Sequence, residues 1–548
     1  MVNDNVAALT MNQVISKATK DYLAGNPIYS VEDILKIENG VLEKVHEMFD
    51  EHNVICDKDK KWTIPRELSF AQIAVIMSTV FTIRNIRCCP QNNDPEYDFL
   101  GIYIDETVVE LLGKYKEKLG TYVISEEIFV KIATVFKFSI TEKECKEIIS
   151  RLKSDSPVVL RCAERDLVAV ANGIFNYASK ELLPFSKEHV FLAKSQVAYN
   201  PNATLPVITM PDGIPWNPES WMSSLSDDPE VVNLLWEITG AIIRPNVRWN
   251  KSAWMVSDTG NNGKGTLCEM MRQLCGDGVC VSIPLSDFSK DFALEPLIYA
   301  QAIIVDENDV GVFIDKVGNL KSIITNDVIS MNRKFKTPIA FQFKGFMVQC
   351  LNEKPRFKDK SESFYRRQLF IPMTKCFTGA ERKYIKNEYL HRQDVLEYIM
   401  KRVLEMNYYT LSEPACCREA LNEYKEYNDP VRQFWSEVRE EFVWNILPRK
   451  FLIALYHGWY KENCPSGHEL NTSTFMEELK KIVQNDDMWR FTGEARVKKD
   501  DIGKPELLIY TYGLQAPWRS EYYKGNDEAK ISTPDKLKEK YTNCLVRR

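Results

Sequence analysis

The sequence predicts an α/β protein with a buried parallel sheet, mainly helical regions before it, and a separate C-terminal region of helices and strands. Three observations predict this class. Four short apolar runs lie between residues 253 and 373, and each borders glycine, acidic, amide or arginine residues, as strands of a buried sheet do. Segments with apolar residues at helical spacing flank this window, at 230–244 and 394–406. Two further helical patterns and a pair of strand patterns follow residue 429.

The chain has 548 residues, of which 44% are hydrophobic, so it exceeds what one core usually serves. We expect a mainly helical accessory region, a domain that precedes the core, the α/β core itself and a C-terminal domain, with the bounds 1–90, 91–228, 229–410 and 429–548. Local patterns predict a helix within Phe70–Ile86, a short strand at Phe99–Tyr103, a tight turn between strands at Asn172–Gly173 and an irregular connector at 197–217.

Composition excludes several classes of protein. A net charge of -6 argues against coating nucleic acid through the whole surface, so any such contact must come from particular loops. The 14 cysteines show no C-x-x-C spacing and the six histidines no H-E-x-x-H, which argues against a zinc site or a disulfide framework and favours free thiols. The sequence has no apolar stretch of the roughly 20 residues that a membrane span needs, and no signal-peptide pattern. We therefore expect a cytoplasmic protein with no membrane partner.

The strongest chemical signal is a loop that connects an apolar run to an amphipathic helix. Backbone amides of such a loop, with the positive end of the helix, can cradle a triphosphate. Lys264 would hold the β- and γ-phosphates of ATP, and the Thr266 hydroxyl would bind Mg²⁺. The pattern departs from the usual one at Asp258 and at Gly265, and taken alone it also fits a glycine-rich turn beside a chance lysine. The predicted loop residues are Gly260, Asn261, Asn262, Gly263, Lys264, Gly265 and Thr266.

An acidic pair follows the next apolar run. Asp306 and Glu307 come directly after residues 302–305, and adjacent side chains at a strand end face different directions. Asp306 would therefore bind Mg²⁺ while Glu307 polarises the attacking water. Alone, such a pair is more often a helix cap or a turn, but its spacing from Lys264 reverses this preference and favours the functional interpretation.

Two later apolar runs border an amide and an arginine pair. Asn352 ends one run and would orient water against the γ-phosphate. Arg366 and Arg367 precede the next run and would reach a neighbouring subunit's nucleotide as an arginine finger, which stabilises the transition state. The alternatives without a catalytic role are an asparagine that simply ends a strand and an arginine pair that simply lies on the surface.

The order of these motifs resembles superfamily 3 helicases, which are AAA+-type ATPases. More narrowly, the segments GNNGKGT, IIVDEND, CLNEKPRF and FYRRQLFIPM resemble the phage, plasmid and poxvirus primase-helicase branch, including replication initiators of mobile genetic islands. Residues 172–206 resemble the domain that precedes the motor in that branch, and the likeness covers about 95–375. The resemblance implies an ATP-driven replicative helicase of a phage or mobile element, forming a homohexameric ring with single-stranded DNA in its pore. A primase or other replication proteins are implied as partners.

A basic hairpin lies between the acidic and amide runs. Two β-prone runs flank the residues Arg333, Lys334, Phe335 and Lys336. In the resembled superfamily the corresponding hairpin projects into the pore of the ring. Lysine and arginine neutralise phosphate while an aromatic ring offers a stacking face, so the composition suits a DNA strand. The alternative is a solvated turn.

The C-terminal region predicts a winged helix. Helical patterns at 446–463 and 471–484 precede two strand patterns within 489–512, around a basic tip. Such a module would bind duplex origin DNA, and its alternative role is protein interaction. The residues expected in the major groove are Asn471, Thr472, Ser473 and Thr474, and those on the phosphates are Arg496, Lys498 and Lys499.

Two other functional classes share part of these signals. A nucleotide kinase shares the G-K-G-T ending, but it usually carries that loop near its N-terminus and needs no basic hairpin. A non-motor origin-binding ATPase would use the site only to switch assembly. We predict no primase activity in residues 1–90, because they carry neither a carboxylate triad nor a zinc signature.

Overall fold

The computed structural model describes residues 9–91, 94–257, 260–309, 313–379, 382–463, 470–496, 506–514 and 541–548. The chain divides into two compact units, one of residues 1–359 and 366–418 and the other of residues 360–365 and 419–548. Among the helices in the described ranges, none combines the length and the hydropathy that a membrane crossing requires.

The first unit begins with three capped helices. Thr10, Ser30 and Ser69 each accept a hydrogen bond from the backbone three residues on, and the residue there returns one, which fixes the helix starts. The helices are α1 (Met11–Gly25), α2 (Val31–Ile55) and α3 (Phe70–Val80). The helix predicted within Phe70–Ile86 therefore ends at Val80. Ile83 instead begins a strand, because it pairs with Ile102 of a neighbouring strand.

A mixed sheet follows these helices, in the order β3-β2-β1-β4. The strand expected at Phe99–Tyr103 is confirmed as β2. The other elements are β1 (Ile83–Arg87), β3 (Tyr122–Val123), β4 (Val158–Leu160), α4 (Glu106–Leu112), α5 (Glu126–Phe136) and α6 (Glu142–Asp155).

A three-stranded antiparallel sheet, β5 (Leu167–Val170), β6 (Gly173–Asn176) and β7 (Glu181–Leu183), precedes the core. The predicted tight turn is present between β5 and β6. It lies at 171–172, one residue before the predicted position, because Gly173 already pairs with Val170. A Cβ atom on Gly173 would lie 2.4 Å from the carbonyl oxygen of Leu183, so only glycine permits this strand approach. The connector at 197–217 is irregular except for the short pair β8 (Ile208–Thr209) and β9 (Pro215–Trp216).

The core of the first unit is a parallel sheet with the order β11-β12-β16-β10-β18. The mixed α/β class that the sequence predicts is confirmed. All neighbours in this sheet run parallel, so their carboxyl ends meet at one edge. Strand β10 lies between β16 and β18, which makes its carboxyl end a topological switch point, the place where open α/β sheets bind ligands. The strands are β10 (Ser252–Val256), β11 (Cys280–Val281), β12 (Ala302–Val305), β16 (Phe346–Leu351) and β18 (Gln368–Pro372).

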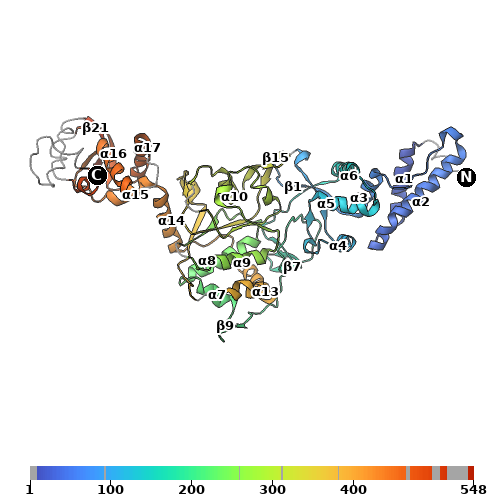
Figure 1. The fold of residues 1–548 in the computed structure, drawn as a ribbon, viewed down its shortest axis with the longest axis horizontal. Coiled ribbons are helices and arrows are strands. Elements are labelled where there is room, and N and C mark those ends of the chain that lie inside the picture. The colour runs from blue at the N-terminus through green and yellow to red at the C-terminus, as the bar shows by residue number, and fades with distance from the viewer. Residues whose placement is uncertain are drawn as a thin grey trace, which may run out of the picture. The chain divides into compact units, whose positions relative to one another are not determined.

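Helices cover both faces of this sheet. On one face, Met255, Ile304 and Val348 pack in a single hydrophobic cluster with α7 (Pro218–Ser224), α8 (Pro229–Ile243), α9 (Lys264–Cys275) and α13 (Gln393–Leu404). Helix α10 (Gly318–Ile324) and a hairpin of β14 (Val328–Arg333) and β15 (Lys336–Gln342) lie on the other side (Figure 1). The helices predicted at 230–244 and 394–406 are thus confirmed as α8 and α13. The short pair β13 (Phe313–Ile314) and β17 (Arg356–Phe357) and the helix α12 (Lys383–Asn387) complete the core.

The second unit has an aromatic core. Phe434, Tyr456 and Trp459 pack together with the ring of Phe475. Its three strands are antiparallel in the order β19-β21-β20. Its elements are α11 (Glu362–Tyr365), α14 (Ala415–Asn428), α15 (Pro430–Val438), β19 (Ile446–Pro448), α16 (Arg449–Asn463), α17 (Thr472–Val483), β20 (Trp489–Arg496), α18 (Leu507–Thr511) and β21 (Tyr541–Arg547).

The prediction of a second strand within 489–512 is wrong. Residues 507–511 form helix α18, and β20 pairs with the distant β21 instead. Glu506 accepts hydrogen bonds from the amides of Val443 and Trp444, which holds the start of α18 against the core. Tertiary packing therefore overrides the β propensity of this segment.

Candidate active site

The loop between β10 and α9 turns sharply at two residues. Asn261 and Gly263 both adopt positive φ, at 55° and 86°. A Cβ atom on Gly263 would lie 2.6 Å from Cδ2 of Leu225, so this position requires glycine for space as well as for conformation. Consecutive backbone amides in such a turn, followed by a helix N-terminus, form a concave anion-binding site. Asp258 lies outside the described residues.

The segment after β18 anchors this loop. The amide of Phe377 donates to the carbonyl oxygen of Asn261 at 2.8 Å, and Nδ2 of Asn261 donates to Oγ1 of Thr378 at 3.4 Å. On the other side of the turn, the amide of Lys264 donates to Oδ1 of Asn262 at 3.3 Å. No sequence signal pointed to residues 377–378, because nothing in their spacing relates them to the loop.

Lys264 begins α9 and is only 4% exposed, while Gly260 and Asn261 are exposed and Gly265 and Thr266 are half-buried. On the inner side of α9, Sγ of Cys268 lies 3.4 Å from Sγ of Cys350 on β16. The hydrogen bond from Cys268 and burial raise the pKa of the Cys350 thiol, and the charges of Lys264 and Asp306 both act on it. The lysine and the acid therefore approach the same place at the carboxyl edge of the sheet.

Asp306 directly follows β12 and forms an ion pair with Arg272 of α9, with 2.8 Å between Oδ1 and Nη2. Burial alone would raise the pKa of Asp306, but the hydrogen bond and charge of Arg272 hold this pKa below its ordinary value. The carboxyl group is therefore ionised at neutral pH. Glu307, the next residue, is exposed. Sequence reasoning missed Arg272, which carries no motif.

Asn308 is a second residue that sequence reasoning missed. Its Nδ2 donates to Oε1 of Gln349 and to the carbonyl oxygen of Cys350, each at 3.0 Å. Its Oδ1 accepts from the amide of Leu285. Asn308 thus holds the acidic turn against β16 and fixes the direction in which the preceding pair points. The sequence did contain a signal for Asn308, because this asparagine directly follows the acidic pair within the segment IIVDEND.

Asn352 and the arginine pair lie at opposite ends of the parallel strands, Asn352 at the carboxyl edge of the sheet and the arginines at the amino edge. Asn352 is exposed and directly follows β16, so it lies at the same edge as the loop and the acidic pair. Arg367 precedes β18, and its carbonyl oxygen accepts from the amide of Ser252 at the start of β10. Arg366 and Arg367 therefore lie at the amino edge, away from the phosphate loop of their own sheet.

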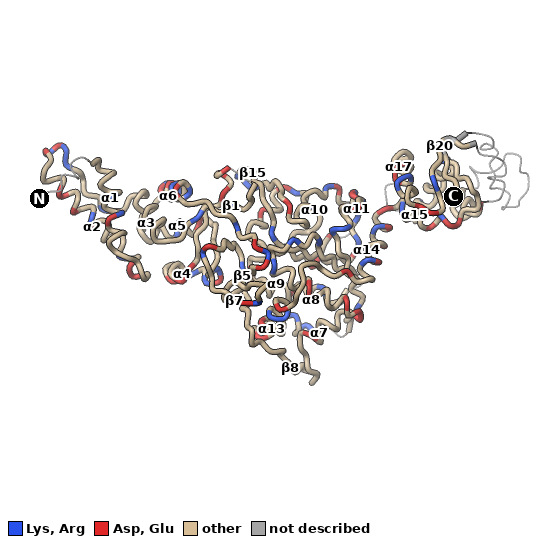
Figure 2. The backbone as a smooth tube through the Cα atoms, turned by 180° about the vertical axis from the view of Figure 1, so that it is seen from behind, with Lys and Arg blue, Asp and Glu red and all other residues tan. Residues whose placement is uncertain are grey.

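The hairpin predicted around Arg333–Lys336 is present, with Lys334 and Phe335 at its tip. Phe335 is 95% exposed and has a positive φ of 58°. Arg333 donates to the carbonyl oxygen of Thr337, and Lys336 lies 3.5 Å from Glu126 of α5. Figure 2 shows Lys and Arg interspersed with Asp and Glu along the described chain. The cations of this tip also have acidic neighbours, because a carboxylate oxygen of Glu295 accepts from the amide of Lys334.

The predicted DNA residues of the second unit differ in accessibility. Asn471 caps α17, and its Oδ1 accepts from the amide and the hydroxyl of Thr474. Thr472 and Ser473 are exposed in the first turn of that helix. Arg496 ends β20, while Lys498 and Lys499 lie outside the described residues.

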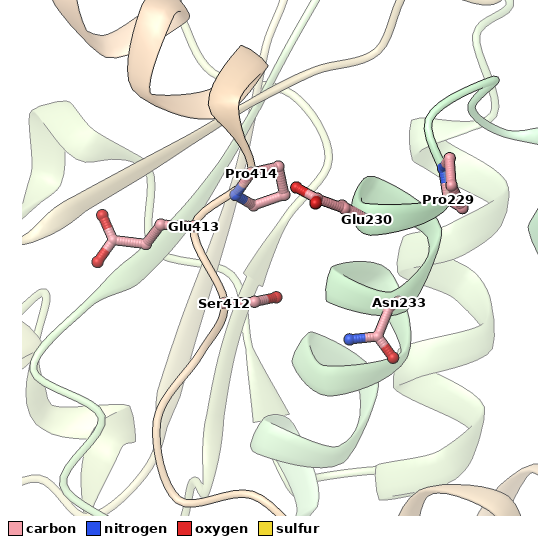
Figure 3. Close-up of a pocket in the computed structure, with 6 residues that line it drawn as sticks. All are labelled: Pro229, Glu230, Asn233, Ser412, Glu413 and Pro414. Atoms are coloured by element: carbon pink, nitrogen blue, oxygen red, sulfur yellow. The ribbon is translucent and has the colours of Figure 1, made fainter.

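Two further features lie away from the sheet edge. A hollow of about 480 Å³ is lined by Pro229, Glu230 and Asn233 of α8 and by 412–414. The side chains of Ser412 and Asn233 point toward each other (Figure 3), whereas the carboxylate of Glu413 points away and pairs with Lys251. Two of these lining residues, Ser412 and Asn233, also bond to the buried carboxylate of Glu237.

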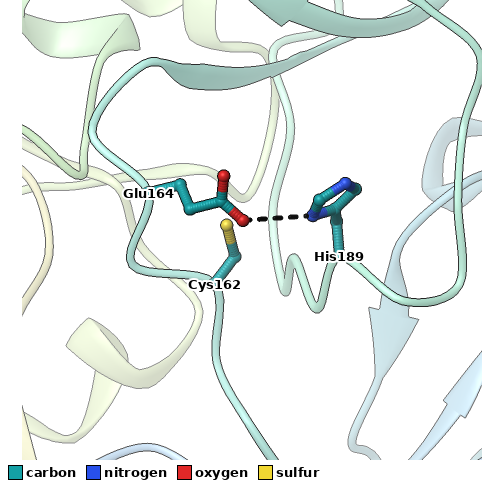
Figure 4. A group of neighbouring side chains, drawn as sticks. All are labelled: Cys162, Glu164 and His189. Carbon is teal, nitrogen blue, oxygen red and sulfur yellow. Dashed lines mark ion pairs between the residues drawn. The ribbon is translucent and has the colours of Figure 1, made fainter.

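The other feature is a cluster of Cys162, Glu164 and His189 (Figure 4), whose ligand-capable atoms lie within 4.8 Å of one another. The buried cations Arg161 and Lys344 both act on the Cys162 thiol, which disfavours a further cation there. We interpret the cluster as a structural contact. Every cysteine in the described ranges is a free thiol, as the sequence predicted.

A parallel sheet whose switch-point strand leads through a tight glycine loop into a helix defines the class of phosphate-loop proteins. Family models support a narrower assignment. The D5 N-terminal-like model matches residues 101–222, and the poxvirus D5 protein-like model matches residues 426–507. A family of unknown function, DUF5906, matches residues 255–367. These D5-type matches confirm the resemblance to the poxvirus primase-helicase branch that the motifs predicted.

Solved structures give a weaker likeness. The apo C-terminal region of NrS-1 is 13% identical, with a TM-score of 0.42, and the match covers 87% of this chain and 99% of that one. JCV helicase is 14% identical with a TM-score of 0.23, covering 38% of this chain and 58% of that one. No curated protein matches the chain.

Proposed function

We propose that this protein is an ATP-driven replicative DNA helicase that acts as a ring and unwinds duplex DNA at an origin. The observation that carries the proposal is the convergence of three predicted elements at one sheet edge. The loop of Lys264, the acidic pair after β12 and Asn352 after β16 all stand at the carboxyl ends of neighbouring parallel strands. The matches to the D5-type family models support the same conclusion.

The residues at this edge fit a nucleotide with Mg²⁺. The loop offers inward-turned amides, a helix N-terminus and the buried Lys264, which suit a polyphosphate. Thr266 and the ionised Asp306 would hold Mg²⁺, which would neutralise charge on the phosphate oxygens. Glu307 would accept the proton of the attacking water, and Asn352 would orient that water.

A ring follows from the position of the arginine pair. Because Arg366 and Arg367 lie at the amino edge, they do not belong to the loop of their own subunit. We propose that they complete the site of a neighbouring subunit, where a guanidinium stabilises charge in the transition state. Hydrolysis would then require assembly, and by family resemblance the assembly is a hexamer.

Single-stranded DNA would bind the hairpin tip. Phe335 is almost fully exposed between cations, as a residue that stacks on bases beside a phosphate backbone needs to be.

Duplex origin DNA would bind the second unit. Its described elements from α15 to β21 follow the order helix, strand, helix, helix, strand, helix, strand. Apart from α18 between the last two strands, this is the order of a winged helix, and the antiparallel pair β20 and β21 would form the wing. We propose that α17 enters the major groove through its first turn, where Thr472 and Ser473 are exposed beside the capping residues Asn471 and Thr474. The phosphates would be contacted by Arg496, Lys498 and Lys499.

The experiment is an unwinding assay on forked DNA with measured ATP hydrolysis. Lys264→Ala should lose both activities, whereas Glu307→Gln should keep ATP binding and lose hydrolysis. Binding without turnover by the unaltered protein would favour an assembly switch, and stimulation by nucleoside monophosphates would favour a kinase. Removal of residues after 429 should abolish origin preference while hydrolysis persists, and an origin preference that survives would refute the role of the second unit.

A further inference from the structure

A second lysine lies against the phosphate loop from a distant part of the sequence. Lys386 belongs to α12, more than a hundred residues after Lys264. Its Nζ lies 3.7 Å from the position that a Cβ atom on Gly265 would occupy. The ammonium group therefore rests beside the first turn of α9, next to the residue that follows Lys264.

In the described part of the chain, the ammonium group of Lys386 is not used by another contact. Among the described residues, no acceptor lies within hydrogen-bond or ion-pair distance of Lys386 Nζ. The side chain is half-buried, so its charge stands beside the loop without a bonded partner in those ranges.

The position of Lys386 gives a physical reason for an unusual residue in the loop. Ser or Thr commonly follows the lysine of a phosphate loop, and here Gly265 stands in that place. The missing side chain leaves room that the ammonium group approaches. Two contacts fix this geometry: Phe377 donates to Asn261 at the start of the segment, and His391 lies 3.4 Å from Glu269 of α9 at its end.

We infer that Lys386 is a second phosphate-binding cation of its own subunit's nucleotide site, contacting the β- and γ-phosphates from the side of Gly265. The inference rests on the proposed ATP site. A triphosphate carries more negative charge than Lys264 alone neutralises, and a preplaced ammonium forms a charge-assisted hydrogen bond without further ordering. Lys386 thereby links the segment after β18 to the presence of nucleotide.

Equilibrium binding of a fluorescent non-hydrolysable ATP analogue with Mg²⁺ tests the inference. Lys386→Gln should bind about tenfold more weakly, the loss expected for one charge-assisted hydrogen bond. Lys386→Arg should bind within about threefold of the unaltered protein, because it keeps the charge. Lys383→Gln is the matched control: it removes an exposed lysine from the same helix and should change affinity by less than about twofold.

Lys264→Ala separates this inference from the proposed function. If Lys264→Ala loses binding while Lys386→Gln binds normally, the role of Lys386 is overturned and the ATP site stands. If the unaltered protein binds no analogue, the proposed function itself fails.

A second measurement uses the unaltered chain and so avoids any folding defect of a variant. Acylation of lysines, followed by mass spectrometry, should slow at Lys386 when the analogue saturates the protein, and remain unchanged at Lys383. Equal labelling of Lys386 with and without the analogue would contradict the contact.

Discussion

Substitution of one loop glycine gives a sharp test, because two glycines of the same loop differ in what they tolerate. Gly263 has φ of 86°, and a Cβ atom there would lie 2.6 Å from Cδ2 of Leu225. A left-handed conformation costs an L-residue about 1–2 kcal/mol, and the contact with Leu225 adds to this cost. Gly263→Ala should therefore favour other loop conformations and weaken binding of the ATP analogue by about 5- to 30-fold.

Gly260→Ala is the matched control. Gly260 has no positive φ, and among the described residues no heavy atom lies within 4 Å of a Cβ atom placed there. Its affinity for the analogue should stay within about twofold of the unaltered protein, as for other exposed positions. Both variants are compared by fluorescence titration, with thermal unfolding as a check on folding. Normal binding by Gly263→Ala, or an equal loss in Gly260→Ala, would refute the proposed loop geometry.

Three other perturbations test separate parts of the molecule. Lys334→Ala at the hairpin tip should reduce unwinding more than ATP hydrolysis, whereas the exposed Lys316→Ala should affect neither, and an equal loss of both activities in Lys334→Ala would indicate a structural role. Trp459→Ala should lower the free energy of unfolding by about 3–5 kcal/mol in denaturant titrations, because this indole is fully buried against Phe434, and a loss below about 1 kcal/mol would contradict that packing. Burial lowers the pKa of Lys344 to about 8 from its usual 10.5, so between these values the unfolded chain binds more protons and stability from this group rises with pH. Lys344→Met should lose up to about 2 kcal/mol of that rise between pH 8 and 9.5, and an identical pH dependence would count against the burial of the charge.

The core was predictable because its signals are local. A buried strand, a glycine loop and a helix follow one another within 252–275, and the acidic and amide runs end where parallel strands end. The same local logic failed for 507–511, whose β-prone residues form helix α18. There β20 pairs with β21, which is distant in the sequence, and no pattern near β20 predicts this pairing.

The partners of the site residues were not predictable from spacing. Arg272 pairs with Asp306 across 34 residues, and Lys386 approaches Gly265 from beyond β18. Both contacts depend on how α9 and α12 pack against the sheet, which is a property of the whole core. Motifs identify the residues of a phosphate site, whereas the charges that tune it come from the fold.

The rate of ATP hydrolysis per subunit, measured against protein concentration with and without single-stranded DNA, tests the shared site most directly. If the arginine of one subunit completes the site of the next, the rate per subunit should rise with concentration, and single-stranded DNA should raise it further. A rate per subunit that is independent of concentration and insensitive to DNA would contradict both the shared site and the motor.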